Sequence, residues 1–441
     1  MTLTLEEVTA LAPDDASAKA ARGLVAPAKW PLLGANDVAV WGECQGSGSR
    51  PYQTQVDLAG PAFRCSCPSR KFPCKHGLAL LMLRAQDSAR FTATEAPAWV
   101  GEWLASRGEK AQKKEERQAE KAAAPVDPQA AARREAQRWQ RVAGAAQDLH
   151  RFLADQLAAG LGALDPAAVR LWATVAARMV DAQAPGLGAR LQEAAAGVRQ
   201  GEYWPEQTLH RLGLLQLACD GIARRQALPE GVQADLRTVA GWPHDQAEVA
   251  ALGERSVDDW RVLGCVTEER TDKLTERRVW LHGARDGHRA LLLDHAFAGR
   301  GFESAWSVGA TVRATLAWFP GASPLRALAL DRAPAAAAAP LHTDADEWGA
   351  IARRVAACPW TPLHPLHVRA ARVHNTGDGA WLVQGGHAWP LILGEGPLWQ
   401  LLACTGGGAL DLFGEWDGAR IRPLTAWQAG SARPVWTREA A

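Results

Sequence analysis

The chain has 441 residues, 47% of them hydrophobic, and its 49 basic and 48 acidic side chains leave a net charge of +1. That length predicts roughly two to four domains, and the balanced charge excludes a chain-wide electrostatic footprint for nucleic acid, so any such contact would be local. No apolar run approaches the roughly 18 residues that span a bilayer, and the acidic start MTLTLEEVTALAPDD lacks the pattern of a secretory signal, so we expect a cytoplasmic protein without membrane contact.

Residues 1–104 are predicted to form the first region, with two short helices at its start. Residues 38–44 are typical of a strand, and GSGSRP after them is typical of a turn. The next stretch, YQTQVD, alternates large and polar side chains as a half-buried strand does. A β-hairpin is therefore expected at the start of a compact module that covers about residues 40–85.

Four metal-ligand side chains follow this hairpin within RCSCPSRKFPCKHGLALLM. Cys65 and Cys67 are separated by one residue, as are Cys74 and His76, and residues two apart in an extended segment point to the same side. Three thiolates and one imidazole complete the tetrahedron of a structural Zn²⁺. We therefore predict that these four residues bind zinc. Apolar residues recur at helical spacing after the last ligand, which predicts that it lies at the start of an amphipathic helix.

Two other interpretations of the cluster are less favoured. Two disulfides would need an oxidising compartment and would leave the histidine unexplained. A catalytic cysteine would need a separate base, and three neighbouring thiols without a metal would oxidise one another. Cys44 could be a spare ligand, but the tetrahedral set is complete, so a small buried residue is favoured there. Outside the cluster five cysteines remain, an odd number that argues against pairing: Cys44, Cys219, Cys265, Cys358 and Cys404.

The pattern Cys-x-Cys, a short spacer and Cys-x-His before a hydrophobic helix resembles the SWIM zinc finger, and CSCPSRKFPCKHGLALL is similar to its bacterial form. The resemblance covers about residues 40–85, and the rest of the chain resembles the long bacterial SWIM proteins only in layout. It implies a zinc-organised module that binds DNA or protein, and it implies no chemical reaction. Long bacterial members are often encoded beside a MoxR-type AAA+ ATPase and a von Willebrand factor A (VWA) domain protein, which the resemblance therefore suggests as partners.

Four basic residues surround the predicted ligands: Arg64, Arg70, Lys71 and Lys75. They could hold phosphates, as cations beside a zinc knuckle do in nucleic-acid-binding proteins. The favoured alternative is that they offset the negative charge of zinc with three thiolates, or are simply solvated. Few polar side chains suited to reading base edges accompany them, which argues against sequence-specific recognition.

A charged, alanine-rich segment without aromatic residues, 105–129, is predicted to be a partly helical linker. Residues 130–251 then show helical periodicity punctuated by proline and glycine, which predicts a bundle of antiparallel helices. From 252 to 441 the period changes to two and turn residues recur at short intervals. This pattern predicts antiparallel sheets or a small barrel, with one helix near 344–357.

The chain contains 20 tryptophans and only two tyrosines. Many tryptophans fall in the last predicted strands and could stack bases or grip a peptide, although anchoring of thin β-layers is favoured. These positions include Trp381, Trp389, Trp399, Trp416 and Trp427. His364 and His367 in HPLH suggest a second metal site only weakly, because Pro365 lies between them and no carboxylate or thiol is near.

No phosphate loop, GxGxxG, HExxH or GxSxG motif is present, so no enzyme is expected. A less favoured alternative is an enzyme with its site in the β region, which a polar pocket of converging titratable groups would reveal. The sequence thus predicts a multidomain α+β protein with a small zinc-bound ββα-like module, a linker, a helical bundle and a Trp-rich antiparallel β region. The favoured function is a zinc-binding interaction protein with a protein or nucleic-acid partner, and the alternative is a DNA-binding regulator.

Overall fold

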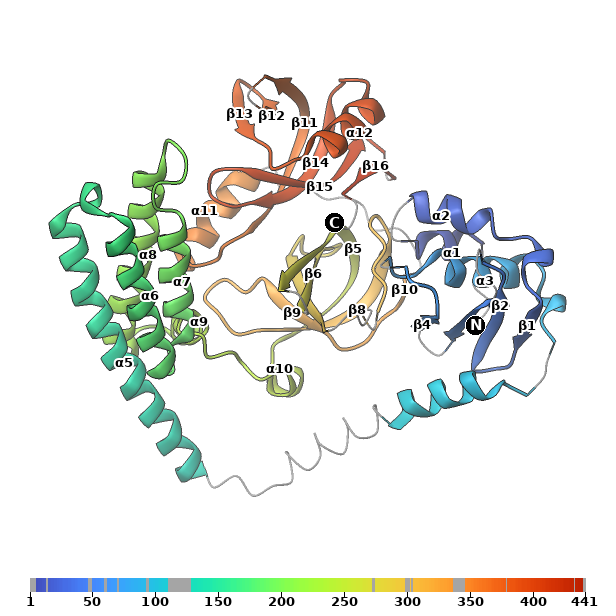
Figure 1. Cartoon of the computed structure of the whole chain (residues 1–441), viewed down its shortest axis with the longest axis horizontal. Coiled ribbons are helices and arrows are strands. Elements are labelled where there is room, and N and C mark those ends of the chain that lie inside the picture. Colours follow the sequence, from blue (N-terminus) through green and yellow to red (C-terminus); the bar gives the residue numbers. More distant parts are fainter. Residues whose placement is uncertain are drawn as a thin grey trace.

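The structure, a computed structural model, describes residues 5–12, 15–46, 50–58, 62–69, 71–92, 95–109, 128–271, 274–297, 302, 304–335, 346–377, 379–431 and 433–438. They form an N-terminal module (5–109), a helical bundle (128–252) and a β region (255–438) that contains two sheets. Figure 1 shows the module and the bundle on opposite sides of the β region. The α+β, multidomain fold class is confirmed.

The N-terminal module is a four-stranded antiparallel sheet with helices packed on it. Its strands pair in chain order: β1 (Leu32–Ala35), β2 (Ala39–Cys44), β3 (Tyr52–Asp57) and β4 (Ala62–Cys65). Its labelled α-helices are α1 (Leu5–Ala10), α2 (Asp15–Arg22) and α3 (Lys75–Gln86). The strand pair β2–β3 is the expected hairpin.

Helix α3 forms the centre of this module's core. Every residue from His76 to Leu83 is buried, so the prediction of an amphipathic helix is wrong for this stretch. The physical reason is that α3 contacts strands of the sheet as well as α1 and α2, which leaves no side of these two turns in water. Figure 1 shows α1 and α2 beside α3.

The helical region contains six helices among the residues that the structure describes, and the last of them packs mainly on the β region rather than on the other five. They are α5 (Pro128–Ala159), α6 (Pro166–Asp181), α7 (Pro185–Ala196), α8 (Trp204–Ala223), α9 (Glu230–Val239) and α10 (Gln246–Leu252). Three of them begin at a proline, which suits the first helical turn because its ring replaces an N–H that has no helical partner there. The core includes Leu149, Trp172 and Leu215. Trp172 also donates its indole N–H to Gln156 Oε1 at 2.9 Å, which links α6 to α5.

The predicted linker at 105–129 is described only at its ends. Residues 105–109 continue a helix that begins at residue 98, and residues 128–129 open α5, while residues 110–127 lie outside the described part of the chain. In the described residues, no helix has both the length and the apolar character needed to cross a membrane.

The first sheet of the β region closes on itself. Its strands are β5 (Arg255–Thr271), β6 (Leu274–Gly283), β7 (Arg289–Phe297), β8 (Thr311–Trp318), β9 (Arg326–Ala329) and β10 (Ala333–Pro334). Antiparallel pairs join β8, β5, β6 and β7, and β9 completes the circle by pairing parallel to β7 and antiparallel to β8. The result is a small barrel, one of the two predicted arrangements.

The second sheet is open and antiparallel, in the order β13-β12-β11-β14-β15-β16. Its elements are α11 (Glu347–Ala357), β11 (His364–Thr376), β12 (Gly379–Gln384), β13 (His387–Pro390), α12 (Glu395–Thr405), β14 (Leu410–Trp416), β15 (Ile421–Gln428) and β16 (Pro434–Thr437). Helix α11 is the helix expected near 344–357. Helix α12 was not predicted, because Gly394, Gly396 and Pro397 at its start are also typical of turns.

Buried aromatic and charged side chains join these units. Trp280 of the barrel packs with Phe413 and Trp427 of the second sheet. Arg278 donates from Nε to Glu415 Oε1 at 2.7 Å and from Nη2 to Oε2 at 2.9 Å, so one buried ion pair also links the two sheets. The indole N–H of Trp360, after α11, donates to Leu214 O in the bundle at 2.9 Å.

The tryptophans of the last strands mainly build cores. Trp427 is fully buried, and Trp389 and Trp416 are half-buried against the core of the second sheet. Trp399 on α12 differs, since 59% of its surface is exposed. This burial agrees with anchoring of thin β-layers rather than with an open aromatic face.

Candidate metal centre

The structure brings together the four side chains that the sequence analysis proposed as zinc ligands. One ligand atom from each of Cys65, Cys67, Cys74 and His76 lies within 4.8 Å of the others. Zn–S bonds of about 2.3 Å and Zn–N bonds of about 2.0 Å place ligand atoms about 3.5–3.8 Å apart in a tetrahedron. The Sγ of Cys65 and the Nδ1 of His76 are 3.7 Å apart, which fits one zinc ion between them.

The first ligand pair lies where the sheet ends. Cys65 is the last residue of β4 and pairs with Thr54 of β3. Directly after it, the N–H of Ser66 donates to Gln53 O at 2.9 Å, and the N–H of Gln53 donates to Ser66 Oγ at 3.0 Å. These two bonds fix the bend that follows β4 and thereby the position of Cys67.

The second ligand pair lies at the start of α3 rather than in an extended segment. Cys74 is the N-cap residue, in extended conformation, and His76 lies in the first turn. The prediction that both pairs are extended is therefore wrong for this pair. The pair still converges because helical side chains tilt toward the N-terminus, which directs His76 back toward Cys74.

Neighbouring side chains hold two of the ligands in place. The hydroxyl of Thr54 lies 3.2 Å from Cys65 Sγ and donates to the sulfur when it is a thiolate. The ring of Tyr52 lies against His76, with 4.9 Å between ring centroids. A Cβ on Gly77 would lie 2.8 Å from Cδ1 of Phe63, so only glycine lets the helix approach the sheet this closely directly after the histidine ligand.

The four groups by themselves compete for protons. Hydrogen bonds from Cys65 and then Cys74 hold the pKa of Cys67 well below its usual range, whereas bonds to Cys65 and Cys67 together with burial raise the pKa of Cys74. Burial acts against a charged His76, but its contacts with Cys65 and Cys67 outweigh burial and raise the pKa of the imidazole to about 9. A divalent cation favours the thiolate form of all three cysteines at once, so the donor set suits zinc.

Cys44 does not belong to the centre. Its side chain is fully buried in the core of the module, and burial raises the pKa of its thiol to about 11. A protonated, buried thiol is a small apolar residue, which was the favoured interpretation.

The predicted basic residues divide by exposure. Arg64 and Lys75 are exposed beside the ligands, whereas Lys71 is half-buried. Arg70 lies outside the described residues.

The weak suggestion of a second metal site at HPLH receives no support. Within the described residues, the groups of three or more potential ligands comprise the cluster above and no other. His364 and His367 are both buried. Burial, followed by Arg354, lowers the pKa of His364 to about 4, and burial, followed by Arg289, lowers that of His367 to about 3.

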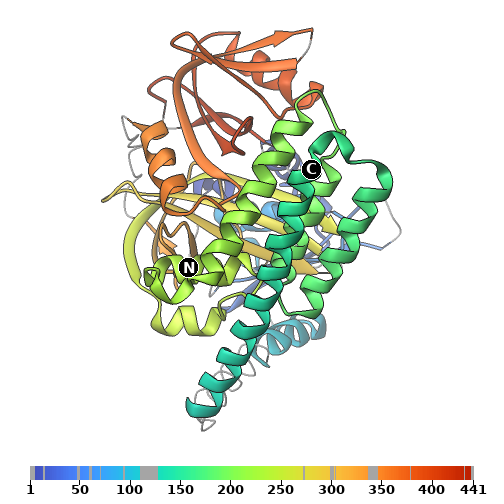
Figure 2. The same cartoon turned by 90° about the vertical axis from the view of Figure 1, so that its left-hand side faces the viewer.

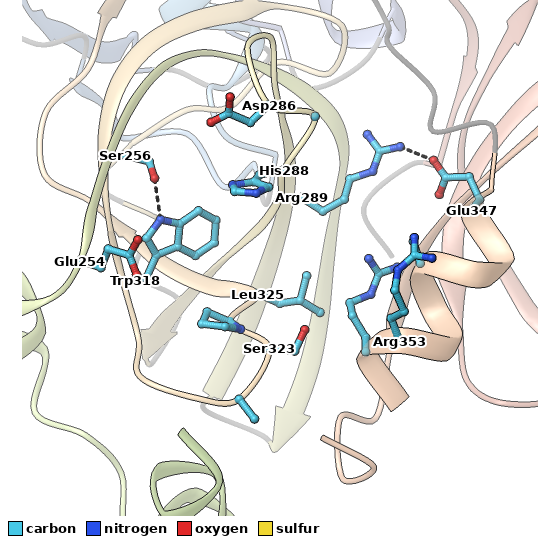
Figure 3. Close-up of a pocket in the computed structure, with 15 residues that line it drawn as sticks. Glu254, Ser256, Asp286, His288, Arg289, Trp318, Ser323, Leu325, Glu347 and Arg353 are labelled. Carbon is cyan, nitrogen blue, oxygen red and sulfur yellow. Dashed lines mark hydrogen bonds and ion pairs between the residues drawn. The ribbon is translucent and has the colours of Figure 1, made fainter. Parts of the chain in front are cut away.

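A polar cleft in the β region had no sequence signal. It has a volume of about 500 Å³ and lies between the barrel and α11 (Figure 3). On one side Arg289 Nη2 donates to Glu347 Oε1 at 2.6 Å, and on another the indole N–H of Trp318 donates to Ser256 Oγ at 2.9 Å. Its lining comes from several separate segments, so no motif could reveal it. The lining includes several titratable side chains, among them Asp286, His288 and Arg353 (Figure 3).

Two family models match this chain. The SWIM zinc finger matches residues 52–84, from β3 into α3, and this range holds all four ligands. The SWIM-associated four-helix bundle domain matches residues 137–240, from α5 to just beyond α9. No curated protein and no solved structure matches the chain. The chain therefore contains a SWIM zinc finger and a SWIM-associated four-helix bundle domain, and the finger holds a Cys₃His cluster that indicates zinc binding.

Proposed function

We propose that this protein binds nucleic acid without catalysing a reaction, and that its zinc finger contacts the phosphate backbone through Arg64 and Lys75. The supporting observation is the exposure of both side chains directly beside the ligands. Arg64 precedes Cys65, and Lys75 lies between Cys74 and His76, so zinc binding fixes the backbone that carries both cations.

The charge of the finger supports a phosphate contact. Zinc with three thiolates and a neutral imidazole carries a net charge of about −1. The exposed cations Arg64 and Lys75 more than offset this charge, even without Lys71. This excess of positive charge is local to the finger, because the chain as a whole is nearly neutral.

The burial of α3 argues against a protein partner on the finger helix. A partner that binds a helix face needs exposed apolar side chains, and residues 76–83 of α3 are all buried. A protein partner, including the ATPase and VWA proteins suggested by resemblance, would have to use another surface. A protein partner is therefore the alternative that the experiment below distinguishes from nucleic-acid binding.

The experiment is a titration of zinc-loaded protein against a fluorescein-labelled DNA duplex of about 20 base pairs, followed by anisotropy at several salt concentrations. The test variant is Arg64→Glu with Lys75→Glu. Its matched control is Lys19→Glu with Arg22→Glu, which reverses two exposed charges on α2 of the same module.

We expect the affinity of the wild-type protein for the DNA duplex to fall steeply as the salt concentration rises. Each lost phosphate contact should lower the slope of log affinity against log salt by about 0.9, so the test variant should lose about two units and the control none. Equal affinities of the wild type and the test variant at every salt concentration would refute the proposal and favour a protein partner.

A further inference from the structure

A second cluster of cations lies on the helical bundle, far along the chain from the finger. It comprises Arg134, Arg138 and Arg141 of α5, Arg225 after α8 and Arg237 of α9. We call it the bundle arginine cluster. Three of its members, together with Trp242, line a hollow of about 440 Å³.

Tryptophans hold part of this cluster rigidly. The guanidinium carbons of Arg138 and Arg237 lie 4.2 and 4.4 Å from the ring centre of Trp242. That of Arg225 lies 4.1 Å from the ring centre of Trp139, and the two indole rings are 5.6 Å apart. Stacking in this way fixes the guanidinium planes and leaves their edges to donate hydrogen bonds.

The positive charge of the cluster has little local compensation. In the parts of the chain that the structure describes, none of the five arginines forms an ion pair with a carboxylate. Burial and then the like charges of Arg237 and Arg141 lower the pKa of Arg138. Glu135 is the one acidic side chain among the described residues that line the hollow. Arg138 Nε and Arg237 Nε are buried donors without a described partner.

Stacking explains only three members of the cluster. Arg134 and Arg141 are exposed and contact no indole ring in the described structure, yet they continue the row of Arg138 at spacings of four and three residues. Such spacing places all three on one face of α5. Figures 1 and 2 show the N-terminal turns of α5 projecting beyond the other helices.

From these observations we infer that the bundle arginine cluster is a second binding surface for the phosphate backbone of nucleic acid. This inference rests on the proposed function and extends it to the bundle. Seven residues of helix between Arg134 and Arg141 span roughly 10 Å, the length over which one DNA strand presents about three phosphates. Arginine forks bind phosphate oxygens in pairs, and the ring of Trp242 already contacts two guanidinium groups and a second indole, so we expect the surface to contact the backbone rather than the bases.

The test uses the full-length, zinc-loaded protein and the variant Arg134→Glu with Arg141→Glu. These two side chains are exposed and support no tryptophan, so the substitution should leave the bundle folded. The control, Arg151→Glu with Arg170→Glu, reverses two exposed charges elsewhere on α5 and α6. Circular dichroism of each variant confirms that the helices remain. The probes are labelled duplex DNA, single-stranded RNA of equal length and a polyglutamate peptide.

We expect the test variant to lose about tenfold in nucleic-acid affinity for each of the two contacts at about 0.1 M salt, with a salt slope lower by about two units. The control should stay within about twofold of the wild type. The duplex and RNA probes show which nucleic acid is preferred.

Three other outcomes would each decide a different point. Suppose that the wild type binds nucleic acid, that the variant Arg64→Glu with Lys75→Glu loses this affinity, and that the variant Arg134→Glu with Arg141→Glu keeps it. The inference about the bundle is then wrong, and the proposed function stands. If only the bundle variant loses affinity, the bundle binds and the proposal for the finger is wrong. If the wild type binds polyglutamate but neither nucleic acid, both proposals are wrong and the cluster serves an acidic protein.

Discussion

The most quantitative prediction concerns His367, a histidine at the centre of the joined β-sheets. Only 3% of its surface is exposed, and neither ring nitrogen has a hydrogen-bond partner among the described residues. Burial, followed by the charges of Arg289, Arg369 and Arg261, lowers its pKa from 6.5 to about 3. The folded state therefore favours the neutral ring, while the unfolded chain takes up a proton near the ordinary pKa.

The sign and size of the effect follow from this difference. A lowered pKa stabilises the folded state fully above the unfolded value of 6.5, and this stability is lost as the pH falls toward about 3. One pKa unit corresponds to about 1.4 kcal/mol, so acidification from pH 7 to about pH 4.5 should cost about 2.5 kcal/mol through this one residue.

The variant His367→Leu should lack this cost because leucine does not titrate. Hydrogen exchange of the β11 amides in urea measures the opening free energy of this sheet locally, which avoids the unfolding of other domains. The loss of opening free energy between the two pH values should be about 2.5 kcal/mol smaller in the variant than in the wild type. His374→Leu, at an exposed position of the same strand, is the control and should behave like the wild type. Equal acid sensitivity of His367→Leu and the wild type would refute the reasoning.

Two further substitutions test the packing described above. Gly77→Ala should force α3 away from Phe63, at a cost of about 1–3 kcal/mol in stability, and should weaken zinc retention in a chelator competition. The control Gly101→Ala has open space around its Cβ position and should be neutral. Equal zinc retention in the two variants would contradict the close packing at Gly77. Glu415→Ala should destabilise the joined sheets by about 1–3 kcal/mol in denaturant unfolding, because Arg278 Nε and Nη2 and the indole N–H of Trp280 lose their buried acceptor. Glu268 and Glu276 still pair with Arg278 and compensate its charge. A change below about 1 kcal/mol would show that the pair with Glu415 contributes little.

The metal centre could be predicted from sequence because its ligands are close neighbours in the chain. Cys65, Cys67, Cys74 and His76 all fall within a dozen residues, so spacing alone limits the geometry. The conformation of the second pair could not be predicted, since the N-cap position of Cys74 depends on how α3 packs on the sheet. Burial of both faces of α3 likewise depends on α1 and α2, which no local periodicity records.

Long-range arrangements account for most of what the sequence did not reveal. The helical and β regions followed from periodicity, but closure of the barrel depends on the short strand β9 meeting both β7 and β8. The bundle arginine cluster could not be predicted from sequence for a similar reason. Arg225 and Arg237 reach the face of α5 only through tertiary packing around Trp139 and Trp242.

The zinc content of freshly purified, reduced protein tests the metal centre most directly, with Cys74→Ala as the test variant and Cys44→Ala as the matched control. We expect about one zinc per chain in the wild type and in Cys44→Ala, and loss of zinc in Cys74→Ala together with the folding of the N-terminal module. Wild-type protein without metal, or a Cys74→Ala variant that keeps its full zinc content, would contradict the zinc centre on which the proposed function depends.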